Sequence, residues 1–313
     1  MSAPTSHAGT KALRATDTGA VPSEAKLDHN RSAASFAYKC RELLQKRDLA
    51  PDAEYYRATT KLGAYLLLDR IGVGHARVHT VLEGIDNLTE EHLRRPVVLK
   101  PLEGCSAAGV MVLEPDGKSY YDRLTDRSRS LDEIRLRAGK VALRREISDV
   151  WLLEEPFTAG TGVPDDLKFY TFQGDIALIL QRRGRPRPDN RGVRASYRWY
   201  DAEWNPVETG KHTDKIDDSL EPPTDRKALE EAARRVSTAS PYAFTRVDLF
   251  ATDQGPQVGE VNAWVGGYDH FSEEWDLRLG AAWEAAELRV PTRRRPIPEA
   301  VTMGAYPPPW WRR

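Results

Sequence analysis

The segment from Phe244 to Gly267 constrains the fold more than any other part of the chain, because it has the pattern of a β-hairpin. Polar and apolar residues alternate over Thr245–Thr252 and again over Gln257–Trp264. The residues between them, Asp253-Gln254-Gly255, are of the types that favour a tight turn. The sequence therefore predicts two antiparallel strands joined at this turn.

If the hairpin folds about Gln254, its charged and its apolar residues fall on opposite faces. One face then carries Asp248 opposite Glu260 and Arg246 opposite Asn262. The other face is mostly apolar, with three residues of the first strand opposite three of the second: Val247, Leu249 and Ala251 opposite Val261, Gly259 and Gln257. A one-residue slip would exchange the two faces, and the apolar set argues against such a slip.

Two carboxylates side by side on a sheet face repel each other, and burying them without a partner is costly. A hard divalent cation relieves this repulsion, and oxygen ligands of this kind suit magnesium shared with substrate phosphates. The alternative is an exposed hairpin in which Arg246 neutralises one of the two acids. The hairpin alone leaves both interpretations open.

Composition sets the class of protein. A length of 313 residues predicts one large domain or two modest ones. The residues are 40% hydrophobic and 30% charged with a net charge of −1, and this balance gives no sign of nucleic acid or a membrane surface as partner. The longest apolar run, around Tyr65–Leu68, is too short to span a membrane, and no signal peptide is expected. The only cysteines, Cys40 and Cys105, form neither a disulfide framework nor a zinc site and favour a reducing cytoplasm.

Periodicity and turn residues predict further helices and strands along the chain. The expected helices are 35–47, 53–70, 130–145, 225–238 with Thr224 as its N-cap, and 277–288. The expected strands, besides the hairpin, are 97–100, 110–113, 150–153, 168–172, 176–181 and 196–200. Hairpins interleaved with helices predict an α+β fold with antiparallel or mixed sheets.

A second motif follows the strand that ends at Lys100. The loop EGCSAAG after it can present backbone N–H groups to phosphates, and Lys100 can add a point charge to the same anion. The loop is neither a Walker nor a Rossmann motif, and an ordinary hairpin connection is the alternative.

A third motif, Glu154-Glu155-Pro156-Phe157, ends the strand 150–153. An acid beside backbone groups that a proline leaves available suits the amino edge of an adenine, and Phe157 can pack near the ring. The alternative is a charged strand exit without a ligand.

The segment 182–194 (RRGRPRPDNRGVR) is rich in arginine. It is either a lid over an anionic substrate or phosphate, a nucleic-acid contact, or a solvated loop, with Arg182 and Arg183 best placed to reach a site. Residues 1–33 are expected to be disordered, and the tail 291–313 ends in PPPWWRR without indicating a role.

Together these motifs resemble the ATP-grasp superfamily: a strand ending in Lys-Pro before a glycine loop, the Glu-Glu-Pro-Phe exit, and Arg-Val-Asp followed by Glu-Val-Asn. Their order and spacing are similar to those of D-alanine–D-alanine ligase-type enzymes. The segments VPDDLKFYTFQGDIALI, Tyr200–Pro206 and FTRVDLF…VGEVN look like the TupA-like (teichuronopeptide-biosynthesis) branch, although that branch commonly has threonine and phenylalanine where this chain has Asn262 and Trp264. The resemblance covers about Tyr56 to Gly280.

The resemblance implies an ATP-grasp fold, in which two α+β subdomains clasp ATP between antiparallel-rich sheets. The expected organisation is a disordered segment (1–33), a reduced N-terminal helical region (34–95), a small subdomain with the phosphate lid (96–153), a large subdomain with the metal and substrate site (154–290), and the tail (291–313). The region before Lys61 is too short for a complete additional domain, so the usual substrate-side domain is expected to be missing or reduced.

The resemblance also implies roles for residues. Asp248, Glu260 and Asn262 would hold Mg²⁺ between the ATP phosphates, and Arg246, with Arg182, would stabilise charge on the transferred phosphoryl group. The residues expected to contact the nucleotide are Lys61, Lys100, Glu154, Glu155, Phe157, Asp166 and Lys168, with Gly104, Ser106 and Gly109 in the lid. The residues expected to contact substrate are Arg183, Gly266, Gly267 and His270.

The implied activity is that of an ATP-dependent carboxylate–amine ligase, which forms an amide through an acyl phosphate and releases ADP and phosphate. The expected cofactors are ATP and Mg²⁺, and the expected partners are a small-molecule or peptide carboxylate and an amine, with no nucleic acid and no membrane. Two alternatives stay open: a kinase or phosphotransferase that uses the same nucleotide site, and a nucleotide-binding partner protein that has lost its chemistry. The acyl donor, the amine and the oligomeric state are not predicted.

Overall fold

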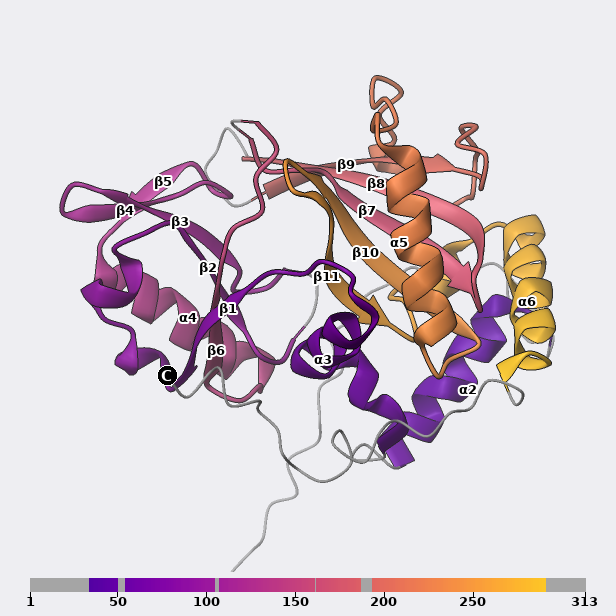
Figure 1. The fold of residues 1–313 in the computed structure, drawn as a ribbon, viewed down its shortest axis with the longest axis horizontal. Helices are drawn as coiled ribbons and strands as arrows, with labels where there is room; N and C mark the ends of the chain where they lie inside the picture. Colours follow the sequence, from indigo (N-terminus) through magenta and orange to yellow (C-terminus); the bar gives the residue numbers. More distant parts are fainter. Residues whose placement is uncertain (1–33, 50–53, 105–106, 161, 187–192, 291–313) are drawn as a thin grey trace, which may run out of the picture.

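The fold is that of a computed structural model, which describes residues 34–49, 54–104, 107–160, 162–186 and 193–290. The predictions for residues 1–33, for the tail 291–313, for Ser106 and for the middle of the arginine-rich segment lie outside these described residues. The predicted α+β class is confirmed, because two antiparallel sheets are combined with helices (Figure 1).

The described helices and strands follow each other in the order of the sequence. The α-helices are α2 (Phe36–Leu49), α3 (Lys61–Ile71), α4 (Leu131–Arg145), α5 (Arg226–Ala239) and α6 (Glu273–Glu287). The strands are β1 (Val78–Glu83), β2 (Val97–Pro101), β3 (Met111–Asp116), β4 (Ser119–Asp122), β5 (Arg127–Arg129), β6 (Val150–Glu154), β7 (Asp166–Phe172), β8 (Asp175–Pro186), β9 (Val193–Tyr200), β10 (Phe244–Thr252) and β11 (Gly255–Asn262). The 3₁₀ helices are η1 (Glu54–Thr59), η2 (Ile85–Asn87), η3 (Glu90–Leu93), η4 (Thr213–Lys215) and η5 (Tyr268–His270). No helix in the described part of the chain combines the length and the apolar character needed to cross a bilayer.

The first sheet has the strand order β1-β6-β2-β3-β4-β5, and α4 covers it. Ser130 caps α4: its hydroxyl accepts from the backbone N–H of Glu133, and the Glu133 carboxylate accepts from the backbone N–H of Ser130. The buried residues of α4, Ile134, Ala138 and Ala142, pack with strand residues such as Trp151.

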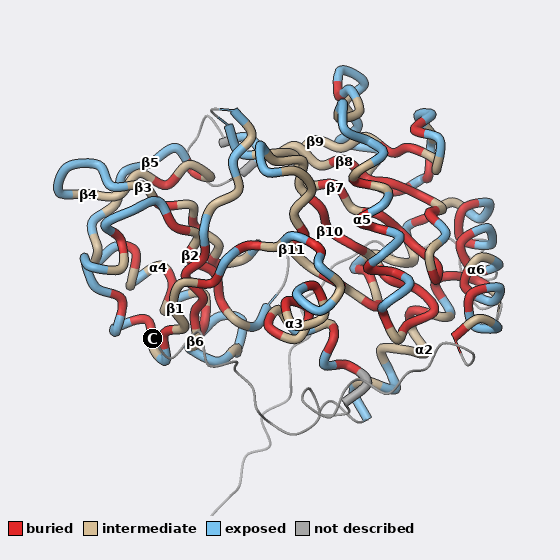
Figure 2. The backbone as a smooth tube through the Cα atoms, in the orientation of Figure 1, coloured by how far each residue is buried: buried red, intermediate tan, exposed pale blue. Residues whose placement is uncertain are grey.

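The second sheet has the order β11-β10-β7-β8-β9, and different helices cover its two faces (Figure 1). Odd-numbered β10 residues, Val247 and Leu249, belong to a core with α3 and α5. Even-numbered Phe244 belongs to a core with α2 and α6. Figure 2 shows buried residues along these strands and on α5 and α6.

Helices α2 and α6 cover only part of their sheet face. Phe172, Phe244 and Leu180 lie in the core beneath these helices. Farther along the same strands and on the same face, the residues become charged: Asp166 and Lys168 on β7, Arg182 on β8, and Arg246 and Asp248 on β10. The sheet therefore presents an apolar half to the helices and a polar half beyond them.

Several sequence-based predictions about elements are wrong in detail. The strand predicted for 176–181 continues to Pro186, and β9 begins at Val193, so both ends of the segment predicted as an arginine-rich loop belong to strands. The helix predicted for 53–70 is interrupted, because η1 ends at Thr59 and Thr60 then caps α3 by accepting from Gly63 N. Helix α5 has Asp225 rather than Thr224 at its N-cap, and α6 begins four residues earlier than expected because Ser272 caps it. Strands β1, β4 and β5 were not predicted.

The hairpin has the predicted register where its charged residues lie. Arg246 pairs with Asn262 and Asp248 with Glu260. Beyond Asp248 a bulge shifts the register by one, so Leu249 faces Val258 instead of the expected Gly259. A Cβ at Gly259 would lie 2.6 Å from Phe250 Cε2, so the ring of Phe250 occupies the space that a side chain there would need.

Candidate functional site

The centre of the candidate site is Asp248, which is 3% exposed and lies between two cations. Arg246 Nε donates to Asp248 Oδ1 at 2.6 Å, and its Nη2 donates to Oδ2 at 2.8 Å. Lys168, the register partner of Asp248 on β7, donates from Nζ to Oδ2 at 2.5 Å. The β10–β7 pairing therefore places Lys168 opposite this carboxylate, and the alternation of side chains along β10 places Arg246 on the same face.

The group extends along β7 and β8. Lys168 Nζ lies 2.8 Å from Asp166 Oδ2, and Arg182 Nη1 lies 3.9 Å from the same oxygen. The other oxygen, Asp166 Oδ1, is buried and has no hydrogen-bond partner among the residues that the structure describes. A buried carboxylate oxygen without a donor is costly, which makes this atom a free acceptor for a ligand or ion.

The group extends to β11 as well. Arg246 Nη2 lies 3.8 Å from Glu260 Oε2, and Asn262 Nδ2 lies 3.5 Å from the same atom. The Glu260 side chain is 38% exposed, so it faces solvent while Asp248 is buried. We call the set Asp166, Lys168, Arg182, Arg246, Asp248, Glu260 and Asn262 the Asp248 cluster.

Charge compensation decides the protonation of this cluster. Burial alone would raise the pKa of Asp248, but Arg246 and Lys168 outweigh it, and the pKa lies below its ordinary value. Burial raises the pKa of Asp166, and Lys168 offsets this only in part. Burial alone would lower the pKa of Lys168, but its two carboxylate neighbours raise it above the ordinary value. Asp248 is therefore a permanent anion at neutral pH.

The donor set fits magnesium by its chemistry. Asp248, Glu260 and Asn262 offer carboxylate and amide oxygens from adjacent positions of one sheet face, and Asp166 Oδ1 is a further acceptor nearby on β7. Within the described residues, no three His, Cys, Asp or Glu side chains are already arranged as a metal centre. A metal ion here would share Asp248 with Arg246 and Lys168.

A second charged group lies on the first sheet. Lys100 Nζ lies 2.8 Å from Glu154 Oε2 and donates to the Tyr65 hydroxyl at 2.7 Å. The Tyr65 hydroxyl donates in turn to Glu154 Oε1 at 2.8 Å. We call these three residues the Lys100 cluster; all of them are buried, and they join β2, β6 and α3.

The N-terminus of α3 is tied to the predicted phosphate loop. Lys61 Nζ donates to Leu102 O at 3.1 Å and to Gly104 O at 3.4 Å. Gly104 has φ +101° and Gly109 has φ +81°, a conformation that favours glycine. Lys61 therefore holds the start of this loop against α3.

The predicted adenine segment leaves the sheet as expected after Glu154. The Glu155 N–H donates to Arg77 O at 2.9 Å, so this donor is already used. The Phe157 ring packs on Phe250 of β10, with 5.0 Å between ring centroids. The exit segment thus connects the first sheet to the strand that carries Asp248.

Arg183 is not brought to the Asp248 cluster. Successive strand residues point to opposite faces, and Arg183 lies on the face opposite Arg182. Its guanidinium instead binds Asp165, with Nη2 to Oδ2 at 2.6 Å. The substrate role predicted for Arg183 at this site has no support in its position.

Gly266, Gly267 and His270 follow β11 and lie near a lysine that the sequence analysis did not single out. Lys211 Nζ donates to Gly266 O at 2.6 Å. Nothing in the local sequence around Lys211 indicated this, because the contact joins segments far apart in the chain. Tyr65 was likewise missed as a polar residue, since its position on α3 suggested only packing.

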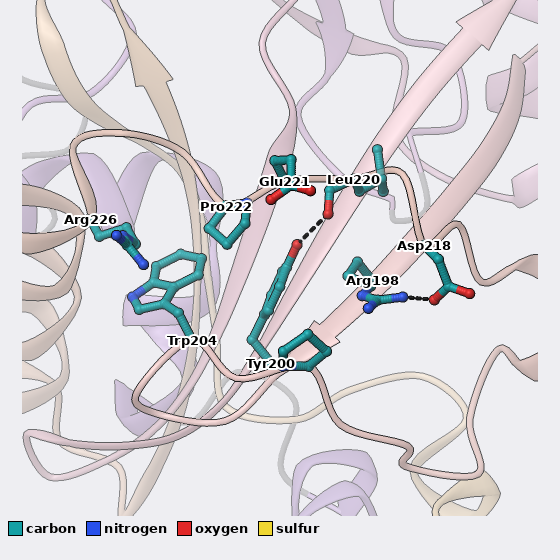
Figure 3. Close-up of a pocket in the computed structure, with 9 residues that line it drawn as sticks. Arg198, Tyr200, Trp204, Asp218, Leu220, Glu221, Pro222 and Arg226 are labelled. Atoms are coloured by element: carbon teal, nitrogen blue, oxygen red, sulfur yellow. Dashed lines mark hydrogen bonds and ion pairs between the residues drawn. The ribbon is translucent and has the colours of Figure 1, made fainter.

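A cavity of about 340 Å³ lies away from the Asp248 cluster, and its lining includes Arg198, Tyr200 and Trp204 (Figure 3). Tyr200 belongs to the core on the α5 face of the sheet, and its hydroxyl donates to Leu220 O at 2.9 Å. Arg198 is paired with Asp218. Trp204 Nε1 donates to Glu230 Oε1 at 2.7 Å, and Arg198 Nε has no hydrogen-bond partner among the described residues. None of the residues that line this cavity belongs to the Asp248 cluster.

Comparison with known proteins adds the following. The model of the family described as TupA-like ATPgrasp matches residues 46–284. A comparison with curated protein sequences finds no match. Solved structures similar to this chain include D-alanine–D-alanine ligase from Bacillus anthracis, at 16% identity and a TM-score of 0.48, covering 76% of this chain and 70% of that one. They also include the ATP-grasp ligase PsnB complexed with a phosphomimetic variant of its minimal precursor, Mg and ADP, at 15% identity and a TM-score of 0.42, covering 75% of this chain and 60% of that one.

Proposed function

The chain belongs to the TupA-like ATP-grasp family, and we propose that it is an ATP-dependent ligase that joins a carboxylate to an amine. The predicted ATP-grasp fold is confirmed by the family match. The observation that carries the proposal is the Asp248 cluster, in which Arg246, Asp248 and Lys168 form a continuous hydrogen-bonded group beside Glu260 and Asn262.

The proposed reaction has two steps. An oxygen of the substrate carboxylate attacks the γ-phosphorus of ATP, the bond to the β-phosphate oxygen breaks, and ADP leaves. The amine nitrogen then attacks the acyl carbon, the bond to the phosphate oxygen breaks, and phosphate leaves while the nitrogen loses a proton. A bare carboxylate is a poor acyl donor at neutral pH, so the protein has mainly to orient the reactants and to compensate charge.

The residues of the Asp248 cluster divide these tasks. Asp248, Glu260 and Asn262 would hold Mg²⁺, which neutralises phosphate charge and orients the phosphates. Arg246 would stabilise negative charge on the transferred phosphoryl group, because its guanidinium is already fixed on Asp248 at 2.6 Å. Lys168 keeps Asp248 anionic by lowering its pKa from the neighbouring strand.

The nucleotide would lie between the two sheets. Lys100 would contact its phosphates, and Phe157 would line the adenine site, where its ring already packs on Phe250. The loop from Gly104 to Gly109 would cover the phosphates, with Lys61 anchoring its first part. Asp166 would bind the ribose or assist the metal through its unpartnered oxygen.

The test is ADP release by the purified protein with Mg-ATP and panels of acids and amines, followed by mass analysis of the products. A ligase releases ADP and phosphate when one acid and one amine are both present, and it yields their amide. A phosphorylated acceptor that accumulates would instead indicate a kinase. Absence of ADP release with nucleotide still bound would indicate a binding protein.

A further inference from the structure

Lys211 is a buried lysine that forms no salt bridge with any described residue. The residue is 4% exposed and lies after β9. In the described part of the chain, no carboxylate oxygen lies within 4.0 Å of its Nζ, and Gly266 O, at 2.6 Å, accepts its one hydrogen bond. The Nζ also lies 5.0 Å from the centroid of the Phe271 ring. Two of the three N–H donors of this ammonium therefore have no partner among the described residues.

The surroundings of Lys211 are rigid. Trp199 Nε1 donates to Lys211 O at 3.1 Å, and Ser272 N donates to Thr209 O at 2.7 Å. The next residue, His212, stacks on Tyr197 with 4.3 Å between ring centroids. These contacts hold the backbone on both sides of Lys211, while its side chain is fixed by Gly266 O and the Phe271 ring. Burying a cation with no carboxylate beside it among the described residues is costly.

The electrostatics agree with this geometry. Burial and, to a smaller extent, the charge of Arg246 lower the pKa of Lys211 to about 7. The geometry links the two groups, because Gly266, whose carbonyl accepts from Lys211 Nζ, lies four residues after Asn262, the last residue of β11 and a member of the Asp248 cluster. An anion beside Nζ would favour the ammonium form and remove most of this penalty.

The segment above Lys211 leaves room for a ligand. Gly266 is exposed, and a Cβ built on it would meet nothing within 4 Å. The backbone N–H groups of Gly266 and Gly267 donate to no acceptor in the residues that the structure describes. Gly266 therefore offers an open position and a backbone donor next to Lys211. At Gly267 a Cβ would lie 3.2 Å from His270 Nδ1 and 3.6 Å from Lys211 Cε, so His270 borders the same space.

We propose that Lys211, with the backbone of Gly266 and Gly267, binds a carboxylate of the acyl donor. This rests on the proposed function, and it assigns the substrate carboxylate to the segment that follows β11. Lys211 would hold the carboxylate beside Arg246, so that the two cations bracket the anion on the side where it attacks ATP. The site would exclude acids that do not reach this ammonium.

The first experiment observes Lys211 directly and needs no turnover. The protein is labelled with ¹⁵N-lysine, loaded with Mg-ADP and titrated with pH by NMR, with and without succinate as the probe anion. We expect succinate to raise the pKa of Lys211 by about one unit or more, because the ammonium gains an anionic partner. The exposed Lys215, whose Nζ lies 3.5 Å from Asp214, should not respond. A Lys211 pKa that succinate leaves unchanged overturns the inference.

The second experiment uses Lys211→Met, which keeps the aliphatic packing and removes the charge, with Lys215→Met as the matched control. We expect Lys211→Met to raise the KM for the acid at least about tenfold while the affinity for Mg-ADP stays within about twofold. Lys215→Met should change neither. An unchanged KM for the acid in Lys211→Met overturns the inference and leaves the ligase proposal intact. A succinate-dependent pKa in a protein that releases no ADP with any acid would instead support the anion site and contradict the ligase.

Discussion

Lys168 and Asp248 face each other directly across β7 and β10, and Lys168 Nζ donates to Asp248 Oδ2 at 2.5 Å. The same Nζ lies 2.8 Å from Asp166 Oδ2, so one partly buried ammonium serves two carboxylates. Without a ligand, Lys168 and Arg246 compensate the negative charge of Asp248, the carboxylate that the proposed metal ion would also bind. The site is therefore assembled by strand pairing, not by the ligand.

Lys168→Met should destabilise the protein because it leaves Asp166 and Asp248 less compensated in a buried position. Removing one partner of a buried pair costs about 3–5 kcal/mol, and Arg246 keeps part of the compensation, so we expect a loss of about 2–4 kcal/mol in the free energy of unfolding. Urea unfolding measures this loss. Mg-ADP should raise the urea midpoint of Lys168→Met more than that of the wild type. The control is Lys118→Met, an exposed lysine whose replacement should leave the unfolding curve as in the wild type. A variant as stable as the wild type would show that Asp166 and Asp248 do not depend on Lys168.

Tyr65→Phe should loosen the Lys100 cluster. The substitution removes the donor of Glu154 Oε1 and an acceptor of Lys100, and an unsatisfied buried group costs about 1–3 kcal/mol. We expect a loss of this size in the free energy of unfolding, together with a higher KM for ATP. Tyr121→Phe is the control, because its hydroxyl bonds Asp126 at an exposed position. Equal effects of the two substitutions would contradict a special role for Tyr65.

The pH dependence of stability should contain a contribution from His212. Burial lowers its pKa to about 4, so between pH 4 and about 6.5 the unfolded chain binds a proton that the folded chain does not. Stability therefore rises with pH across this window, and acid lowers it. His212→Phe keeps the stack on Tyr197 and should reduce the loss of unfolding free energy between pH 6.5 and 4. An unchanged pH slope in the variant would contradict the burial of a neutral imidazole here.

Gly280→Ala tests the packing of α2 on α6. A Cβ at Gly280 would lie 1.8 Å from Ala34 O, so the segment before α2 would have to move. We expect a loss of about 2 kcal/mol or more by thermal unfolding, in the range of overpacked cores. Gly139→Ala in α4 is the matched control, since its Cβ would lie 4.0 Å from Ile85 Cγ2 and helix propensity favours alanine by about 0.5–1 kcal/mol. A Gly280→Ala protein as stable as Gly139→Ala would contradict the close approach.

The sequence allowed the charged half of the hairpin to be predicted because alternation and turn chemistry are local signals. The pairs Arg246–Asn262 and Asp248–Glu260 have the predicted register. The bulge beyond them was not predictable, because it depends on where the Phe250 ring packs relative to Gly259. Long-range packing of this kind has no signature in a single strand.

Two further differences have the same origin. The interruption at Thr60 depends on contact between η1 and α3: a Cβ at Gly63 would lie 2.0 Å from Arg57 O. Arg182 and Arg183 were both assigned to the site because the strand was expected to end at Gln181. Strand β8 continues to Pro186, and the alternation of side chains then sends Arg183 to the opposite face, where Asp165 binds it. The polar roles of Lys211 and Tyr65 were not predicted, because they arise only from contacts with residues far away in the sequence.

The most direct test of the account is calorimetric titration of ADP with and without Mg²⁺, on the wild type and on Glu260→Gln. Glu231→Gln, an exposed carboxylate on α5, is the control. We predict that ADP binding by the wild type depends on Mg²⁺, that Glu260→Gln weakens the Mg-dependent binding at least about tenfold, and that Glu231→Gln leaves it unchanged. ADP binding that is equally tight without Mg²⁺, or unaffected by Glu260→Gln, would contradict the assignment of this sheet face as the metal and nucleotide site.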